Sequence, residues 1–406
     1  MHRYTTPATS QTQAHQPREI SAWLTVFLAF ACTLVTAGSY FAQPLASGIG
    51  QTLGLSPWAV GLVMTLNQLG YCLGLLLVSP LGDVLENRRL LGFTLLASMV
   101  SLSVAAFAPG AGWFLLACFG IGASAIAVQL IVVLAASMSS AQNRGRTVGQ
   151  VTAGLLFGVL LAWPVANLVS VHFGWRALFA AHALVIGTLA CVLRRILPQR
   201  QPGAGANYGL LIRSLWLLWR AHPELRLRAL TQALLFGVFS LFWTTLPLEL
   251  HARHDLSATG LALFGLVGAG GALAAPLAGW AADRGWSHLT ALSGCIAVAL
   301  SCGLFAYDDA LWVLVLAAFF ISAGVQANHV ISQRRVLALQ PEAANRLNSL
   351  YIAVFFAGGA MGSSLATPLF LHDWFWPATA GELVALIACL SCLYQAQHST
   401  GSLLQS

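Results

Sequence analysis

Ionisable side chains are rare inside the long apolar segments of this chain, and His329 and Glu249 are the two that best suit proton transfer. His329 lies close to Gln326 and Asn328 in one segment, and Glu249 follows Pro247 at the end of another. A histidine changes its charge near neutral pH, and a carboxylate that opens to outside solvent could take up a proton there. We therefore predict that His329 and Glu249 couple proton movement to the protein's activity. A neutral histidine hydrogen-bonded to a facing helix would explain the same pattern.

Neutral polar and aromatic side chains form a second set inside the apolar segments. They are Tyr40, Gln43, Asn67, Gln68 and Gln129 in the first half, and Gln232, Trp243, Thr244, Thr245, Gln326, Asn328 and Tyr351 in the second. Polar groups within a membrane are expensive and often mark a substrate path. No arginine or lysine lies at mid-depth to pair with a dicarboxylate or phosphate ester. The set therefore predicts a binding site for uncharged, cationic or amphipathic small molecules, although each amide could instead join two helices.

The composition predicts a protein that lives in a bilayer. Hydrophobic residues make up 58% of the 406 residues and charged residues only 8%, which leaves too little polar surface for a water-soluble fold. The chain contains no lysine, so it has no phosphate-binding loop of the Walker type. The eight cysteines lie in apolar segments and fit the role of small core side chains. We expect no metal, no cofactor and no enzymatic activity, because no cluster of nucleophile, base or metal ligands is present.

Twelve apolar runs are long enough to cross a bilayer, which takes ~20 residues per helix. They cover residues 20–43, 56–80, 89–107, 113–138, 147–170, 175–193, 227–249, 257–281, 288–306, 311–337, 348–371 and 375–397. The expected domains are a disordered cytoplasmic tail (1–19), an N-terminal six-helix bundle (20–193), a basic cytoplasmic linker (194–226), a C-terminal six-helix bundle (227–397) and a second tail (398–406). Within the linker, the mixture of arginine and apolar residues from Tyr208 to Arg220 favours an amphipathic helix on an anionic membrane face or a solvated basic segment.

The arginines predict the orientation. With twelve spans and both termini in the cytoplasm, 17 of the 19 arginines fall on the cytoplasmic side, and only Arg176 and Arg253 lie outside. Such asymmetry follows the positive-inside rule. The basic residues are dispersed over several loops rather than gathered on one face, which excludes a nucleic-acid partner.

The two halves of the chain share a weak repeat. Ser39-Tyr40-Phe41 corresponds to Ser240-Leu241-Phe242, and Asp83 corresponds to Asp283, at offsets of 201 and 200 residues. Two halves that descend from one unit place a substrate path between them, near the middle of the bilayer.

The loop of residues 79–89, SPLGDVLENRR, resembles the G-x-L-x-D-R-x-G-R-R signature of the major facilitator superfamily, and residues 279–284, GWAADR, form a degenerate second copy. The resemblance extends over about residues 20–397 and points to the twelve-helix, bacterial drug:proton antiporter-like branch. It implies a conformational latch formed by Asp83, Arg88, Arg89, Gly279, Asp283 and Arg284, although these charges could simply fix the topology. The chain departs from that branch where Leu116 replaces the usual arginine of the fourth helix.

Together, these features predict an all-α membrane protein of twelve transmembrane helices in two six-helix pseudo-repeats, the major facilitator fold. The expected function is proton-coupled secondary transport, with efflux of small neutral or cationic amphipathic compounds by alternating access. Transport of a sugar or another neutral metabolite, in either direction, is the alternative, and a transport-inactive membrane sensor is the alternative of another class. We expect a monomer in the bacterial inner membrane whose partners are a small-molecule substrate, protons and lipid.

Overall fold

The computed structural model describes residues 20–140, 143–199, 208–254, 256, 258–308 and 310–403. Throughout this described part of the chain, every regular element is a helix. A helix satisfies all its backbone hydrogen bonds within one segment, which a segment surrounded by hydrocarbon requires.

The first half contains eight helical elements. They are α1 (Ala22–Tyr40), α2 (Ala42–Leu53), α3 (Pro57–Leu77), the 3-10 turn η1 (Ser79–Asp83), α4 (Asn87–Ala106), α5 (Ala111–Ser124), α6 (Ala127–Ser137) and α7 (Arg144–Ile196). The 53-residue α7 is two helices joined at Gly174, whose φ of 80° and ψ of 155° are not helical. Glycine adopts such a positive φ without a steric cost.

The second half contains ten elements within the described residues. They are α8 (Tyr208–Ala221), α9 (Pro223–Arg253), α10 (Ala258–Gly270), η2 (Gly271–Leu273), α11 (Ala274–Asp283), α12 (Ser287–Tyr307), α13 (Leu311–Leu339), η3 (Pro341–Ala343), α14 (Ala344–His372) and α15 (Phe375–Leu403). The segment Tyr208–Arg220, for which an amphipathic helix was one of two alternatives, lies in α8.

Local sequence signals set several of the helix starts. Ser21 and Ser56 are in extended conformation and accept hydrogen bonds from the backbone N–H groups of Leu24 and Ala59. A serine in this position satisfies one of the backbone donors that a helix leaves open at its first turn. Pro57 begins α3, where its missing N–H costs nothing.

Ten helices of the described chain are long and apolar enough to cross a membrane. One of these ten is α7, which Gly174 divides into two helices. The stretch from α10 through η2 to α11 covers residues 258–283 and matches the expected segment 257–281. The architecture is therefore consistent with the predicted twelve-helix fold in two six-helix pseudo-repeats.

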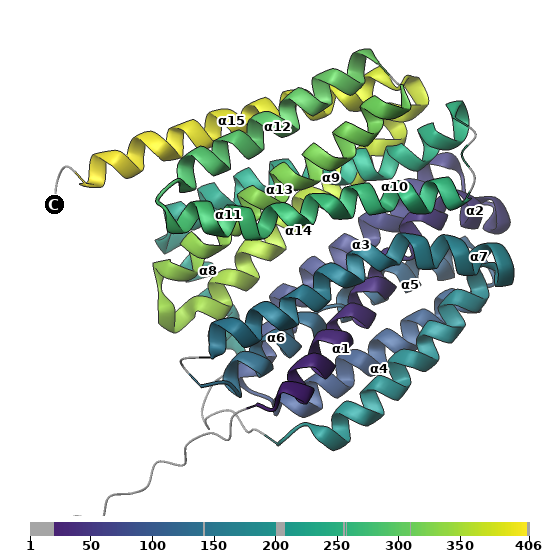
Figure 1. Cartoon of the computed structure of the whole chain (residues 1–406). Coiled ribbons are helices and arrows are strands. Elements are labelled where there is room, and N and C mark those ends of the chain that lie inside the picture. The colour runs from purple at the N-terminus through teal and green to yellow at the C-terminus, as the bar shows by residue number, and fades with distance from the viewer. Residues whose placement is uncertain are drawn as a thin grey trace, which may run out of the picture.

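The helices form two bundles, which are α1–α7 (the N-terminal bundle) and α9–α15 (the C-terminal bundle). Figure 1 shows them as two neighbouring groups, purple to teal and green to yellow. One buried core lies wholly in the N-terminal bundle. The other fills the C-terminal bundle and also takes in Tyr71, Leu75, Ile126 and Trp163 of the N-terminal bundle. The two bundles therefore share a packed interface.

Glycines allow helices within a bundle to approach closely. A Cβ added at Gly362 of α14 would lie 2.0 Å from the carbonyl oxygen of Gly237 in α9, and one at Gly358 would lie 2.2 Å from that of Ala233. Small residues permit this contact between helix backbones. The α9–α14 pair is therefore fixed by backbone packing.

We predict that Gly362→Ala destabilises the protein, because the methyl group would collide with the backbone of α9. Overpacking of this kind costs about 1–3 kcal/mol. Gly92→Ala in α4 is the matched control, since a Cβ there meets nothing within 4 Å. Thermal unfolding in detergent should show a lower midpoint for Gly362→Ala only, and equal midpoints would contradict the packing described.

Candidate functional site between the bundles

The interface between the bundles is formed mainly by α3 against α14 and by α7 against α10. Neutral side chains make hydrogen bonds across it. Gln68 Nε2 donates to Ser240 Oγ at 3.0 Å, and the hydroxyls of Thr65 and Ser363 lie 2.9 Å apart. These contacts join helices that the repeat predicted to lie on opposite sides of a substrate path.

Two further contacts lie near the ends of the interface. Gln43 Nε2 in α2 donates to the backbone carbonyl of Trp243 in α9 at 3.3 Å. At the other end of α3, Ser79 Oγ lies 2.9 Å from Ser349 Oγ of α14. Gln43 and Gln68 are 8% and 4% exposed, so these two predicted site residues are buried where the bundles meet.

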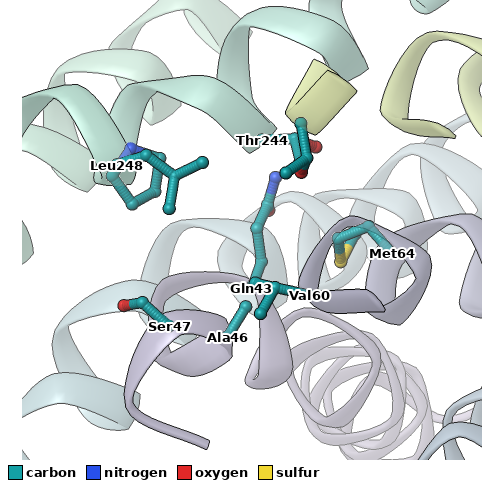
Figure 2. Close-up of a pocket in the computed structure, with 9 residues that line it drawn as sticks. Gln43, Ala46, Ser47, Val60, Met64, Thr244 and Leu248 are labelled. Atoms are coloured by element: carbon teal, nitrogen blue, oxygen red, sulfur yellow. The ribbon is translucent and has the colours of Figure 1, made fainter. Parts of the chain in front are cut away.

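A small pocket lies between the bundles near Gln43. It is lined by Gln43, Ala46, Ser47, Val60, Met64, Thr244, Pro247, Leu248 and Thr367. Figure 2 shows the Gln43 side chain extending from one bundle towards Thr244 of the other. The volume of about 10 Å³ is close to the room that one water molecule needs. The bundles are thus closed on each other around this site.

An aromatic pair crosses the interface beside these amides. Trp163 of α7 makes an edge-to-face contact with Trp243 of α9, with ring centroids 5.1 Å apart. Glycines of α10 make room for both rings, since a Cβ at Gly265 would lie 2.5 Å from Trp163 and one at Gly268 only 1.9 Å from Trp243. Trp243 was predicted from the sequence, whereas Trp163 was missed because it is one apolar residue in an apolar run.

Three predicted substrate residues make hydrogen bonds inside the C-terminal bundle. Gln232 donates to the carbonyl of Val325 at 3.2 Å. Asn328 donates to Cys295 Sγ at 3.5 Å. Thr245 donates to carbonyls of its own helix. The bonds of Gln232 and Asn328 join neighbouring helices, and those of Thr245 lie within one helix, as expected for polar side chains that stabilise helix packing.

The other predicted substrate residues are more dispersed. Gln129 donates to the Tyr71 hydroxyl at 3.3 Å within the N-terminal bundle. Tyr40 ends α1, Asn67 is buried in α3, and Gln326 is partly buried in α13. The structure therefore gathers Gln43, Gln68, Trp243 and Thr244 at the interface and leaves the rest of the set around it.

His329 of α13 and Tyr351 of α14 form a pair in the C-terminal bundle. His329 Nδ1 lies 3.1 Å from the Tyr351 hydroxyl, and the two rings are stacked with centroids 5.6 Å apart. Tyr351 has no exposed surface. Tyr351 was predicted to bind substrate, but its closest polar partner is the predicted proton-coupling histidine.

Glu249, the second predicted proton-coupling residue, is in an ion pair. Its Oε1 lies 3.1 Å from Nε of Arg253 one turn later in α9, and the side chains are 2% and 49% exposed. The arginine links a buried carboxylate to the accessible end of the helix.

The predicted latch residues have separate partners. The Asp83 side chain lies outside the described residues. Arg89 pairs with Glu86 at 2.8 Å, and Arg88 donates to the carbonyl of Leu197 at 3.4 Å. Arg89 therefore forms its ion pair at the start of α4, and Arg88 connects α4 to the end of α7.

In the second copy of the loop, Asp283 pairs with Arg334 of α13 at 2.6 Å, and Arg334 also donates to the carbonyl of Gly279. Arg284 instead stacks over Trp280, 3.7 Å from its ring centre. Arg334 was not predicted from the sequence, because it lies 51 residues from Asp283. In the described chain, no group of three or more His, Cys, Asp or Glu side chains is arranged to hold a metal ion.

Comparison with known families agrees with this fold. The family model of the Major Facilitator Superfamily matches residues 28–363. The chain therefore belongs to the Major Facilitator Superfamily, a class of membrane transporters. Its relatives include the uncharacterized transporter YgaY of Escherichia coli O157:H7, which is 34% identical over 92% of this chain and 95% of its own length. The probable transporter SCO4007 of Streptomyces coelicolor is 35% identical over 94% of this chain and 92% of its own.

Solved structures share the architecture. The nucleoside transporter NupG, as its D323A mutant, has a TM-score of 0.73 at 14% identity, with 91% of this chain and 98% of that chain covered. A bacterial homolog of the human lysosomal transporter Spinster, inward-facing and unoccupied, has a TM-score of 0.67 at 15% identity over 92% and 94% of the chains. At such identities the likeness shows the fold alone.

We predict that cysteines at positions 79 and 349 form a disulfide that joins the bundles, because the two native hydroxyls lie 2.9 Å apart. The measurement uses Ser79→Cys with Ser349→Cys, and a protease site inserted between residues 199 and 208. After oxidation and cleavage, the halves should migrate as one band that reductant separates. The single variants are the controls, and separate halves in the double variant would contradict the interface.

Proposed function

We propose that the protein is a proton-coupled secondary transporter that exports small neutral or cationic amphipathic compounds by alternating access between its two bundles. The observation that carries this proposal is the set of neutral amides and tryptophans at the bundle interface. Gln43, Gln68, Trp163 and Trp243 lie there, and none of these side chains carries a charge. Such a site suits ligands that need no counter-charge, whereas an anion would need an arginine or lysine.

Alternating access requires contacts at both ends of the interface that can break in turn. Gln43 with Trp243 and Ser79 with Ser349 are suitable contacts, because each is a neutral hydrogen bond worth only about 0.5–1.5 kcal/mol net. The Asp283–Arg334 pair, which joins α11 to α13 inside the C-terminal bundle, and the loop at Asp83 would act as the cytoplasmic latch.

Proton coupling is assigned to His329. Its hydrogen bond to Tyr351 joins α13 to α14, and α14 also forms the interface with α3. A change in the protonation of His329 would alter this bond and so reach the bundle interface. Glu249, near the C-terminal end of α9, is the second coupling candidate. Arg253 is the group that would compete with a proton for the Glu249 carboxylate.

The proposed setting is the inner membrane of a bacterium, with both termini in the cytoplasm and the monomer as the working unit. The distribution of arginines supports this orientation, and the relatives named above come from bacteria.

We predict that expression in a bacterium stripped of its own efflux pumps lowers the accumulation of some fluorescent neutral or cationic amphiphiles. A protonophore should restore accumulation, because it removes the driving force of ~2.3 kcal/mol per proton at 100 mV. An accumulation that stays unchanged for the whole panel would remove the export proposal, and uptake of sugars and other neutral metabolites would then be measured.

We predict that His329→Gln abolishes protonophore-sensitive export, because glutamine keeps a polar side chain but cannot gain a proton. Tyr351→Phe should reduce export severalfold, since it removes the hydroxyl that His329 contacts. His372→Gln, at the last residue of α14, is the control and should transport as wild type. Unchanged export in His329→Gln would assign coupling elsewhere, with Glu249→Gln as the next variant.

A further inference from the structure

Gln68 has a buried amide oxygen without a partner. Its Nε2 donates to Ser240 across the interface, while its Oε1 is buried and accepts no hydrogen bond. The whole side chain is only 4% exposed. A buried acceptor without a donor is costly, and most such groups in proteins are satisfied. An oxygen of this kind, placed where the bundles meet, is suited to accept a hydrogen bond from a ligand.

The surroundings of this oxygen are aromatic. A Cβ at Gly359 of α14 would lie 2.4 Å from Gln68 Oε1 and 2.5 Å from the Phe236 ring, so the oxygen lies beside a ring and against a position without a side chain. Phe236 stacks on Phe239 with centroids 5.3 Å apart, and Phe239 lies 6.1 Å from Trp243.

These rings continue to Trp163 of the other bundle. We call the series of Phe236, Phe239, Trp243 and Trp163 the aromatic row. Ring faces attract flat aromatic molecules and cations. The unpartnered acceptor, Gln68 Oε1, lies at the Phe236 end of the aromatic row.

We propose that Gln68 Oε1 anchors the substrate and that the substrate class is aromatic amines, whose N–H group donates to this oxygen while the ring packs along the aromatic row. The proposal rests on the proposed transport function and names the chemistry that the site prefers. The ligand enters when the bundles move apart, since the pocket seen between them has room for about one water molecule.

A matched pair of ligands tests the role of the N–H group. Naphthalen-2-ylmethylamine is a cation with N–H donors at neutral pH, and its N,N,N-trimethyl salt is a cation with the same ring and no donor. Binding of each is measured by titration calorimetry on the purified full chain in detergent. This measurement needs no proton gradient, so it separates recognition from transport.

The wild type should bind the amine about tenfold more tightly than the trimethyl salt, as expected when one buried hydrogen bond is lost. Gln68→Met, which keeps the length but removes the acceptor, should reduce this preference to less than about twofold. Gln68→Glu keeps acceptor oxygens and should keep the preference. Asn167→Leu is the control, because Asn167 is a buried amide that donates only to its own helix at Trp163.

A wild type that binds neither compound, or binds both equally, would overturn the proposal, as would a Gln68→Met variant that keeps the preference. If Gln68→Met does not fold, loss of the preference in Gln68→Leu, purified as a monodisperse protein, supports the proposal, and its retention overturns it. If the protein binds with the expected preference but cellular accumulation is unchanged, the export proposal is contradicted and the proposed binding site is supported. The two proposals therefore fail in different ways.

Discussion

The hydrogen bond from Gln68 to Ser240 belongs to the contact between the two bundles, and the proposed alternating access depends on opening and closing this contact. Neutral hydrogen bonds are worth about 0.5–1.5 kcal/mol each, whereas removing one partner of a buried ion pair costs about 3–5 kcal/mol. The contacts Thr65–Ser363 and Ser79–Ser349 are neutral as well. Each such bond costs less to separate than the ~2.3 kcal/mol that one proton would supply at 100 mV under the proposed coupling.

Packing inside the bundles is of a different kind. A Cβ at Gly122 of α5 would lie 1.8 Å from the Asn67 carbonyl oxygen of α3, and one at Gly154 of α7 would lie 2.0 Å from the Ala29 carbonyl oxygen of α1. Backbones that approach so closely leave no room for sliding or for substitution. Contacts within a bundle are therefore rigid and contacts between bundles are made by side chains, an arrangement that favours movement of the bundles as units.

Much of the fold follows from the sequence, because length and hydropathy alone identify helices that cross a bilayer. The direction in which each side chain points does not follow as readily. Asn328 and Gln232 were grouped with Gln43 and Gln68, yet the first two bond inside the C-terminal bundle. Helices that are apolar on all sides give no periodic signal to distinguish the faces. Trp163 was overlooked for the same reason.

The pairing of charges also depends on the folded structure. Asp283 and Arg284 were predicted to belong to one latch. In the structure Asp283 pairs with Arg334 of another helix, and Arg284 packs on Trp280. The central claim, that a ligand moves between the bundles in exchange for protons, is tested most directly with purified protein in liposomes that contain a pH-sensitive dye. The transported compound is added outside vesicles that start without a pH gradient, and its own flux is followed in parallel. Protons should then move in the direction opposite to the compound. Movement of the compound without any proton flux would contradict the account.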